Sequence, residues 1–275
     1  MKRNFFLFFV CSVYSVSAQT DKYPIPPPMT HEMTEFWTPQ PPVVTPGKIA
    51  TNNVIKPPSD AIVLFDGADL SKWEKAPDKN VLVEGKDMSK FVSTDGVDRQ
   101  WIVKDGVLIV NKEAGDIQTK QSFGDFQLHI EWKIPEGIKG ESQLRGNSGV
   151  FLQNIYEIQI LDSYENVTYA NGQAGSVYKQ TAPLVNAMNP PGEWNAYDII
   201  YTAPTFKEDG TYRTKPTVTL LHNGILIQHN TTILGTTPYT GLPQVKKHGK
   251  EPIRLQAHAD DSAPIGFRNI WIREL

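Results

Sequence analysis

Apolar and polar residues alternate in short runs from residue 62 onward, and turn sequences separate the runs. Residues 126–134 give the clearest case, with apolar side chains on every second position and polar ones, including His129 and Glu131, between them. A period of two is typical of a β-strand with one face in a core. This pattern predicts strands at 62–65, 101–103, 107–110, 126–134, 148–153, 155–161, 195–202, 217–222, 225–229, 253–258 and 267–273.

Turn sequences and the lack of helical periodicity indicate the fold class. Asp105-Gly106 and Asn223-Gly224 each join two runs directly, which is a strong hairpin signal. Residues 203–216 look like a long hairpin loop, and we expect 253–258 to pair with the terminal strand 267–273 and close the domain. No segment has a sustained helical period, and no repeat of fixed length suggests a propeller. The pattern predicts an all-β protein, a β-sandwich or jelly roll.

The first residues follow a different pattern. A positive start at Lys2 and Arg3, an apolar run and small residues ending at Ala18 are typical of a secretory signal peptide. We therefore expect residues 1–18 to be removed and the protein to be secreted or periplasmic. The run is interrupted and too short to span a membrane. Cys11 is the only cysteine, and the residue before it is too large for a lipid-attachment signal, which disfavours a lipid anchor.

The next segment, residues 19–58, is rich in proline and predicts an extended linker. Within it, Phe36-Trp37 either packs back onto the domain or belongs to a mobile spacer. Residues 59–275 then form one domain of about 215 residues, large enough for a core without disulfides. A net charge of −3 and the lack of a basic run argue against a nucleic-acid partner. No later segment is apolar enough to span a membrane.

Polar side chains at alternate positions of several predicted strands mark the candidate binding surface. If the strands that carry them neighbour one another in one sheet, their side chains line a concave face. Carboxylate, amide and imidazole groups suit sugar hydroxyls, with Tyr178, Trp194 or Tyr197 against the sugar rings. A half-solvated sheet without function would show the same alternation. The three groups are His129, Glu131 and Lys133; Glu157 and Gln159; and Arg254, Gln256 and His258.

Short motifs suggest two other kinds of site. The segment from Glu157 to Asp162 resembles the Glu-x-Asp-x-Glu strand of laminarinase-type retaining glycosidases, but Gln159 replaces the middle acid and the spacing puts the outer two on opposite faces. Ordinary retaining hydrolysis is therefore disfavoured. His258, Asp260 and Asp261 could hold a divalent metal, although a polar loop between two strands explains them equally well. No cofactor is required by the sequence.

Several motifs occur in a fixed order over residues 61–275. They are Leu64-Phe-Asp-Gly67, Asp105-Gly-Val-Leu108, Phe126 to Trp132, Asn147-Ser-Gly-Val-Phe151, Tyr156-Glu-Ile-Gln-Ile-Leu-Asp-Ser163, Gly175-Ser-Val-Tyr178, Pro191-Gly-Glu-Trp-Asn195, Ile253-Arg-Leu-Gln256 with His258, and Phe267-Arg-Asn-Ile-Trp-Ile272. Together they resemble the 3-keto-disaccharide hydrolase domain family. This resemblance implies a concanavalin A-like jelly roll of two antiparallel sheets, in agreement with the strand pattern.

The resemblance implies cleavage of 3-keto-glycosides or 3-keto-disaccharides. A ketone at carbon 3 acidifies the hydrogen on carbon 2, so a base can remove it, and the enolate expels the group at carbon 1, with or without later addition of water. This elimination needs one base and a stabiliser of the oxyanion rather than paired carboxylates. We expect Glu157 as the base, His258 as its alternative, Tyr178 as acid, Arg145, Gln159 and Gln256 as hydrogen-bond partners of the ketone, enolate or hydroxyls, and Trp194 as a stacking residue.

Such an enzyme also implies a sugar 3-dehydrogenase that installs the ketone. Two rival functions remain. A non-catalytic carbohydrate-binding module can use the same jelly roll, because this fold alone does not specify a reaction. A laminarinase-like β-glucan hydrolase would act on unoxidised sugars.

Overall fold

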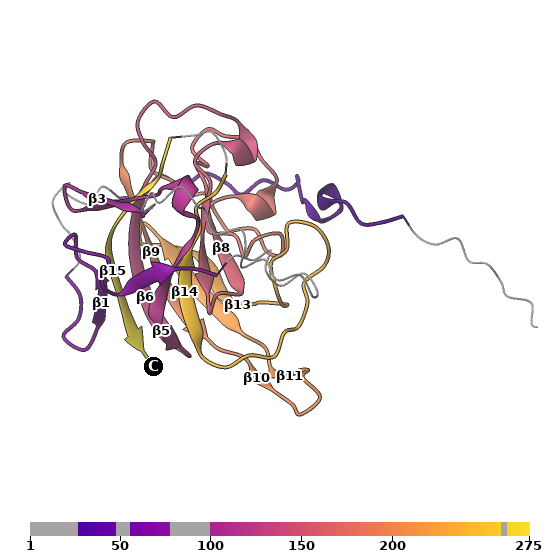
Figure 1. The fold of residues 1–275 in the computed structure, drawn as a ribbon. Coiled ribbons are helices and arrows are strands. Elements are labelled where there is room, and N and C mark those ends of the chain that lie inside the picture. The colour runs from indigo at the N-terminus through magenta and orange to yellow at the C-terminus, as the bar shows by residue number, and fades with distance from the viewer. Residues whose placement is uncertain (1–26, 48–55, 78–99, 260–262) are drawn as a thin grey trace, which may run out of the picture.

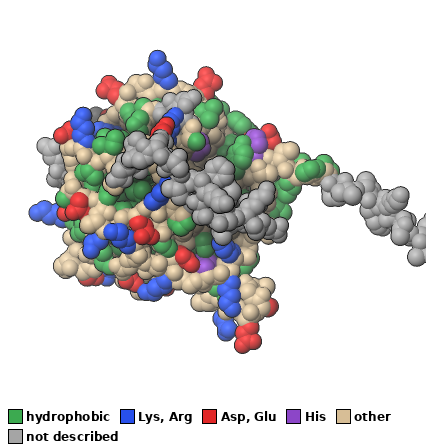
Figure 2. Space-filling view, viewed as in Figure 1, with side chains coloured by type: hydrophobic (Ala, Val, Ile, Leu, Met, Phe, Trp, Pro, Cys, Tyr) green, Lys and Arg blue, Asp and Glu red, His purple; other side chains and the backbone are tan. Residues whose placement is uncertain are grey.

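The computed structural model describes residues 27–47, 56–77, 100–259 and 263–275. The predicted signal peptide and Cys11 therefore lie outside the described residues. Among the described residues, no helix is long and apolar enough to cross a bilayer. Figure 2 shows acidic and basic side chains interspersed over the viewed face, so the described part of that face carries no broad basic patch.

Two antiparallel sheets form a sandwich, as predicted (Figure 1). The larger sheet has eight strands in the order β13-β12-β9-β6-β15-β4-β3, with β1 paired to β15. Its strands are β1 (Ile62–Phe65), β3 (Ile102–Lys104), β4 (Val107–Ile109), β6 (Phe126–Lys133), β9 (Trp194–Thr202), β12 (Thr217–His222), β13 (Ile225–Thr232) and β15 (Gly266–Glu274).

The smaller sheet has five strands in the order β2-β5-β14-β7-β8. They are β2 (Trp73–Lys75), β5 (Ile117–Phe123), β14 (Glu251–Leu255), β7 (Ser148–Leu152) and β8 (Tyr156–Ile160). A separate short hairpin, β10 (Thr205–Phe206) and β11 (Tyr212–Thr214), forms the 203–216 loop. The 3-10 helices are η1 (His31–Thr34), η4 (Lys112–Ala114), η5 (Ser142–Leu144) and η6 (Ala170–Gly172).

The core lies between the inner faces of the two sheets. Leu128 and Ile130 of β6 and Ile158 of β8 are fully buried in one apolar cluster. Burial of each such side chain stabilises the fold by about 1.5–3 kcal/mol. The Tyr197 hydroxyl on β9 also donates to the Gln159 carbonyl at 2.8 Å, which ties the larger sheet to the smaller one. The apolar positions of the alternating pattern therefore face the core.

One predicted pairing is wrong. The strand at 253–258 does not pair with the terminal strand; β14 lies between β5 and β7, whereas β15 pairs with β6, β4 and β1. The pattern also missed β2, because it is short, and β5, because its sequence Ile-Gln-Thr-Lys-Gln-Ser-Phe has a polar middle. The chain crosses between the sheets instead of forming a simple closing hairpin.

The proline-rich segment contacts the domain between residues 31 and 44 (Figure 1, indigo). Val43 forms a parallel bridge with Asn186. The buried Asn171 side chain accepts from the Phe36 amide at 2.9 Å and donates to the Thr34 carbonyl at 3.0 Å. The Trp37 ring contacts Tyr169 edge to face. This part of the linker is therefore fastened to the sandwich rather than being a mobile spacer.

Candidate functional site

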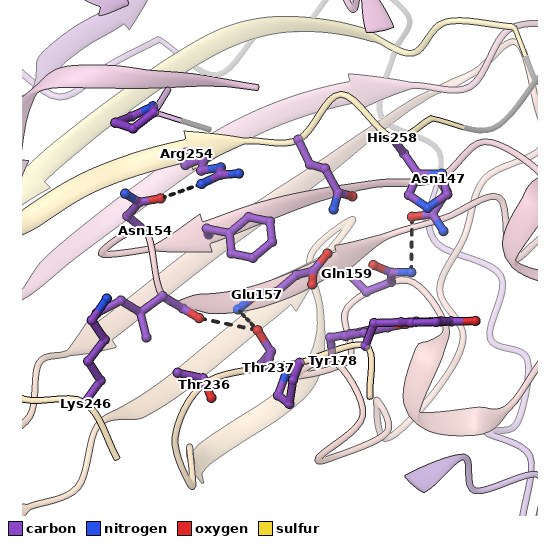
Figure 3. Close-up of a pocket in the computed structure, with 16 residues that line it drawn as sticks. Asn147, Asn154, Glu157, Gln159, Tyr178, Thr236, Thr237, Lys246, Arg254 and His258 are labelled. Carbon is purple, nitrogen blue, oxygen red and sulfur yellow. Dashed lines mark hydrogen bonds between the residues drawn. The ribbon is translucent and has the colours of Figure 1, made fainter. Parts of the chain in front are cut away.

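A cavity of about 680 Å³ opens over the outer face of the smaller sheet. This volume lies within the range of about 300–1,000 Å³ that is typical of small-molecule sites. Figure 3 shows its side chains converging from β7, β8, β14 and the loops beside them. The lining residues are Pro77, Asn147, Phe151, Asn154, Ile155, Glu157, Gln159, Tyr178, Thr236, Thr237, Pro238, Tyr239, Lys246, Arg254, Gln256 and His258.

Strand register explains which side chains meet. Arg254 on β14 pairs with Phe151 on β7, which pairs with Glu157 on β8. Two residues along the same face, Gly149 pairs with Gln159. The backbone N–H of Gln256 donates to the Gly149 carbonyl at 3.0 Å. Two rows of side chains therefore cross three strands. The sequence expectation that the 155–161 and 253–258 segments share one polar face is confirmed.

Gly149 makes the hollow at the centre of these rows. A Cβ atom at this position would collide with Oε1 of Glu157 and would lie 3.0 Å from its Cγ and Cδ. A side chain here would therefore displace the carboxylate. The β7–β8 turn keeps this register, with Gln153 and Asn154 both at positive φ as in a type I′ hairpin.

Glu157 is held from the backbone side. Its amide donates to Oγ1 of Thr237 at 3.1 Å, and its carbonyl accepts from the Tyr178 amide at 3.0 Å. Its side chain points into the middle of the residues drawn in Figure 3, and the residue is 5% exposed. Among the described lining residues, Glu157 is the one carboxylate.

Tyr178 stands beside this carboxylate on the loop that follows η6. Its hydroxyl lies 2.9 Å from that of Tyr169. Burial, together with the charge of Glu157, raises the pKa of Tyr178 above its ordinary value. The phenol therefore keeps its proton at neutral pH and can donate it.

The packed N-terminal segment supports the rim of the cavity. The His31 ring stacks on Tyr239, with centroids 4.7 Å apart. Lys179 Nζ donates to the His31 and Tyr239 carbonyls at 2.8 Å each and lies 3.4 Å from Glu35 Oε1. Burial lowers the pKa of Lys179, and the charge of Glu35 opposes this. The buried ammonium thus joins residues of the segment to the cavity wall.

The opposite end of the cavity is basic. The Arg254 Nε atom donates to Asp116 Oδ2 at 2.6 Å, and Nη1 donates to Asn154 Oδ1 at 3.3 Å. Lys246 reaches the same end from an exposed loop. The sequence pattern placed Arg254 on the polar face with Gln256 and His258, and all three line the cavity. No pattern in the sequence marks the other lining residues Asn154, Lys246, Thr237 and Tyr239.

Three predicted binding residues lie on the other sheet. His129 and Glu131 belong to β6 and Trp194 to β9, and they project from the outer face of the larger sheet. The expectation that all three polar groups share one surface is therefore wrong, because β6 is not a neighbour of β8 or β14. Arg268 pairs with Glu131 at 2.6 Å and lies over the Trp194 ring at 4.0 Å. We assign no substrate contact to this group.

Arg145 is likewise outside the described cavity lining. Its Nε atom lies 2.7 Å from Asp162 Oδ2, and its guanidinium donates to the Tyr164 carbonyl. Burial raises the pKa of Asp162, and the charge of Arg145 opposes this. Asp162 is fully buried in this ion pair and does not face the cavity with Glu157. Glu157 and Asp162 therefore do not form the carboxylate pair of a laminarinase-type strand.

The suggested metal site is only partly described. His258 lines the cavity, whereas Asp260 and Asp261 lie outside the described residues. In the part of the chain that the structure describes, no group of three or more histidine, cysteine, aspartate or glutamate side chains could hold a metal ion.

Known proteins resemble this chain over most of its length. Residues 60–273 match the family described as the 3-keto-alpha-glucoside-1,2-lyase-like domain. A 3-keto-disaccharide hydrolase of Bacteroides thetaiotaomicron is 27% identical over 83% of this chain and 84% of its own. A crystal structure of a candidate glycosyl hydrolase from Parabacteroides distasonis is 61% identical, with a TM-score of 0.73 over 90% of this chain and 97% of that one.

Proposed function

This chain belongs to the family described as the 3-keto-alpha-glucoside-1,2-lyase-like domain, and we propose that it cleaves glycosides whose sugar carries a ketone at carbon 3. The reaction is an elimination. A base removes the hydrogen from carbon 2, and the electron pair forms an enolate with the ketone. The enolate then expels the group at carbon 1, which leaves an unsaturated keto-sugar. Water can add to that product at carbon 1 and complete a net hydrolysis.

The lone carboxylate of the described cavity lining supports this reaction most directly. Ordinary glycosidases use two carboxyl groups about 5–10 Å apart. Glu157 has no second carboxylate among the described lining residues, and Asp162 is held by Arg145. One base suffices for removal of an acidified hydrogen next to a ketone. We therefore assign Glu157 as that base, with His258, which lines the same cavity, as the alternative.

Tyr178 is the proposed acid. Its raised pKa keeps the phenol protonated, so it can donate a proton to the departing oxygen while Glu157 accepts the one from carbon 2. The Glu157 carboxylic acid that results can return its proton to carbon 2 when water adds at carbon 1, and the Tyr178 phenolate takes the proton that this water loses. The protein then ends each turnover in its starting protonation state, without a cofactor of its own.

The proposal places the protein second in a reaction sequence. Its substrate must first be oxidised at carbon 3, so a sugar 3-dehydrogenase has to act before it. We also propose that the protein works outside the cytoplasm, as its N-terminal sequence suggests. Expression of the full chain, followed by cell fractionation and N-terminal sequencing, tests this; a cytoplasmic product that keeps residues 1–18 would contradict export.

The direct test uses paired aryl glucosides of both anomers, one set with a ketone at carbon 3 and one without, each with and without a chelator. Because keto substrates also eliminate spontaneously, rates are read against a blank without protein. Glu157→Gln and His258→Asn are compared with Glu141→Gln, which changes an exposed carboxylate outside the cavity. Removal of a general base typically costs about 10²- to 10⁴-fold in rate.

Each outcome selects one function. Release from the keto substrate alone, lost in Glu157→Gln and kept in Glu141→Gln, supports the proposal. Loss in His258→Asn only would make His258 the base. Release from the unoxidised glucoside would favour an ordinary glycosidase, and binding without release from either would favour a carbohydrate-binding module.

A further inference from the structure

The Gln159 side chain lines the cavity, and its amide oxygen is buried. It is 1% exposed, and its Nε2 atom donates to Gln143 Oε1 at 3.0 Å and lies 3.4 Å from Asn147 Oδ1. Its Oε1 atom has no hydrogen-bond partner among the described residues. An amide nitrogen has two hydrogens, and both are directed to these neighbours. The acceptor is what remains for a ligand.

Backbone carbonyls determine the orientation of this amide. Gln143 Nε2 donates to the Gly172 carbonyl at 3.0 Å, and a carbonyl can only accept. Gln143 must therefore present its oxygen to Gln159. Asn147 Nδ2 donates to the Gln143 carbonyl at 2.9 Å, so Asn147 also presents its oxygen. If the Gln159 amide were reversed, its oxygen would face the side-chain oxygens of Gln143 and Asn147. Its buried N–H groups would then have no acceptors.

The polarity of this site excludes some ligand groups. A ketone, an enolate or a ring oxygen is an acceptor and gains nothing from Gln159 Oε1. A hydroxyl group can donate to it. Gln159 therefore does not stabilise the ketone or the enolate, which was one of the two roles expected from the sequence. Its position suits a hydroxyl that is not oxidised in the substrate.

We propose that Gln159 determines specificity by accepting a hydrogen bond from an unoxidised hydroxyl at carbon 4 or carbon 6 of the keto-sugar, and that Gln143 is the positioning residue that fixes its amide. This inference rests on the proposed reaction for the choice of sugar. Glu157 and Gln159 share one face of β8 two residues apart, which is about 6.6 Å. With carbon 2 at Glu157, the far side of the same ring lies near Gln159.

A double-mutant cycle between protein and substrate tests this assignment. Aryl 3-keto-glucosides with fluorine in place of the hydroxyl at carbon 4 or carbon 6 are compared with the parent, because fluorine cannot donate. In the wild type, one of the two fluorinated substrates should lose about 10- to 100-fold in kcat/KM. In Gln159→Met, that loss should fall below about 3-fold, because no acceptor remains. Gln121→Met, which changes an exposed amide outside the cavity lining, should keep the wild-type preference.

Gln143→Met examines the positioning role separately. Without the Gln143 oxygen, the Gln159 amide can turn, so the discrimination against the fluorinated substrate should shrink to a few-fold while the melting temperature stays near that of the wild type. A purely structural role would lower the rate with all three substrates equally. Equal kcat/KM for the parent and both fluorinated substrates in the wild type would overturn the proposal without any variant.

Calorimetric binding of the unoxidised parent and fluorinated glucosides separates this inference from the reaction. If the wild type binds with the same fluorine penalty but releases nothing from keto substrates, the hydroxyl assignment stands and the reaction fails. If it releases the aryl group from keto substrates with no coupling to Gln159, the reaction stands and the assignment fails. If the wild type neither binds nor cleaves, both fail.

Discussion

Replacing Gly149 by alanine should inactivate the enzyme while leaving it folded. The added Cβ would collide with Oε1 of Glu157 and lie 3.0 Å from Cγ and Cδ. Non-bonded carbon atoms prefer separations of about 3.5–4.0 Å, so the carboxylate must move by about 1 Å. A misplacement of about 1 Å at a reacting group can cost about 100-fold in rate. We therefore expect kcat to fall about 100-fold.

Stability should change much less. The colliding atoms belong to the end of a flexible side chain, and overpacking typically costs about 1–3 kcal/mol. Alanine in a strand regains about 0.5–1 kcal/mol relative to glycine. The free energy of unfolding should therefore fall by no more than about 2 kcal/mol. Rates with the aryl 3-keto-glucoside and urea unfolding curves measure the two effects.

Two comparisons make the result specific. Gly249→Ala adds a methyl group with nothing within 4 Å and without a left-handed φ, so both activity and stability should stay near wild type. In a Glu157→Ala background the carboxylate is absent, so adding Gly149→Ala should change the remaining rate less than about 3-fold. Wild-type kcat in Gly149→Ala, or the same large loss in the Glu157→Ala background, would refute the reasoning.

Four further outcomes are expected. Tyr178→Phe should slow release of alkoxide leaving groups about 10- to 100-fold but nitrophenolate less than about 3-fold, and equal losses would argue against an acid role. Lys179→Met removes charged hydrogen bonds to carbonyls such as that of Tyr239; unfolding free energy should fall by about 1.5–3 kcal/mol and proteolysis near residues 27–47 should accelerate, and unchanged cleavage would contradict this. Burial lowers the pKa of His222 to about 3. Below about pH 6.5 the unfolded state therefore binds a proton on this imidazole that the folded state does not bind. The free energy of unfolding should fall by up to about 1.4 kcal/mol for each pH unit below 6.5. Burial alone would lower the pKa of His129, but Asp198 and Glu131 raise it to about 9, so its contribution is complete below about 6.5 and is lost as pH rises through 9. Urea titrations from pH 4 to pH 10 on His222→Asn and His129→Asn measure both slopes, and unchanged slopes would contradict these assignments.

The sequence predicted what depends on local periodicity. Strand parity is set by neighbouring residues, so alternation alone placed Glu157 and Gln159 on one face of their strand. The choice of sheet did not follow, because β6 has the same alternation as β8 but pairs with β9 and β15 through contacts distant in sequence. His129 was therefore grouped with the wrong strands.

The proline content of residues 27–47 did not predict that this segment packs on the domain. That packing depends on the buried Asn171 amide and the Lys179 ammonium, which bond carbonyls and amides more than 130 residues earlier in the chain. Polar side chains of this kind look the same in a sequence whether water or protein satisfies them. The Arg145–Asp162 pair was unreadable for the same reason.

The pairing of β1 with β15 has a consequence for folding during synthesis. β15 also supplies one of the two neighbours of β6, the strand at the middle of the larger sheet. That edge of β6 cannot be covered until β15, a strand of nine residues, has left the ribosome. Contacts between such distant segments slow folding, because the intervening loop must close first. The larger sheet therefore stays open beside β6 while the strands from β7 to β14 are being made.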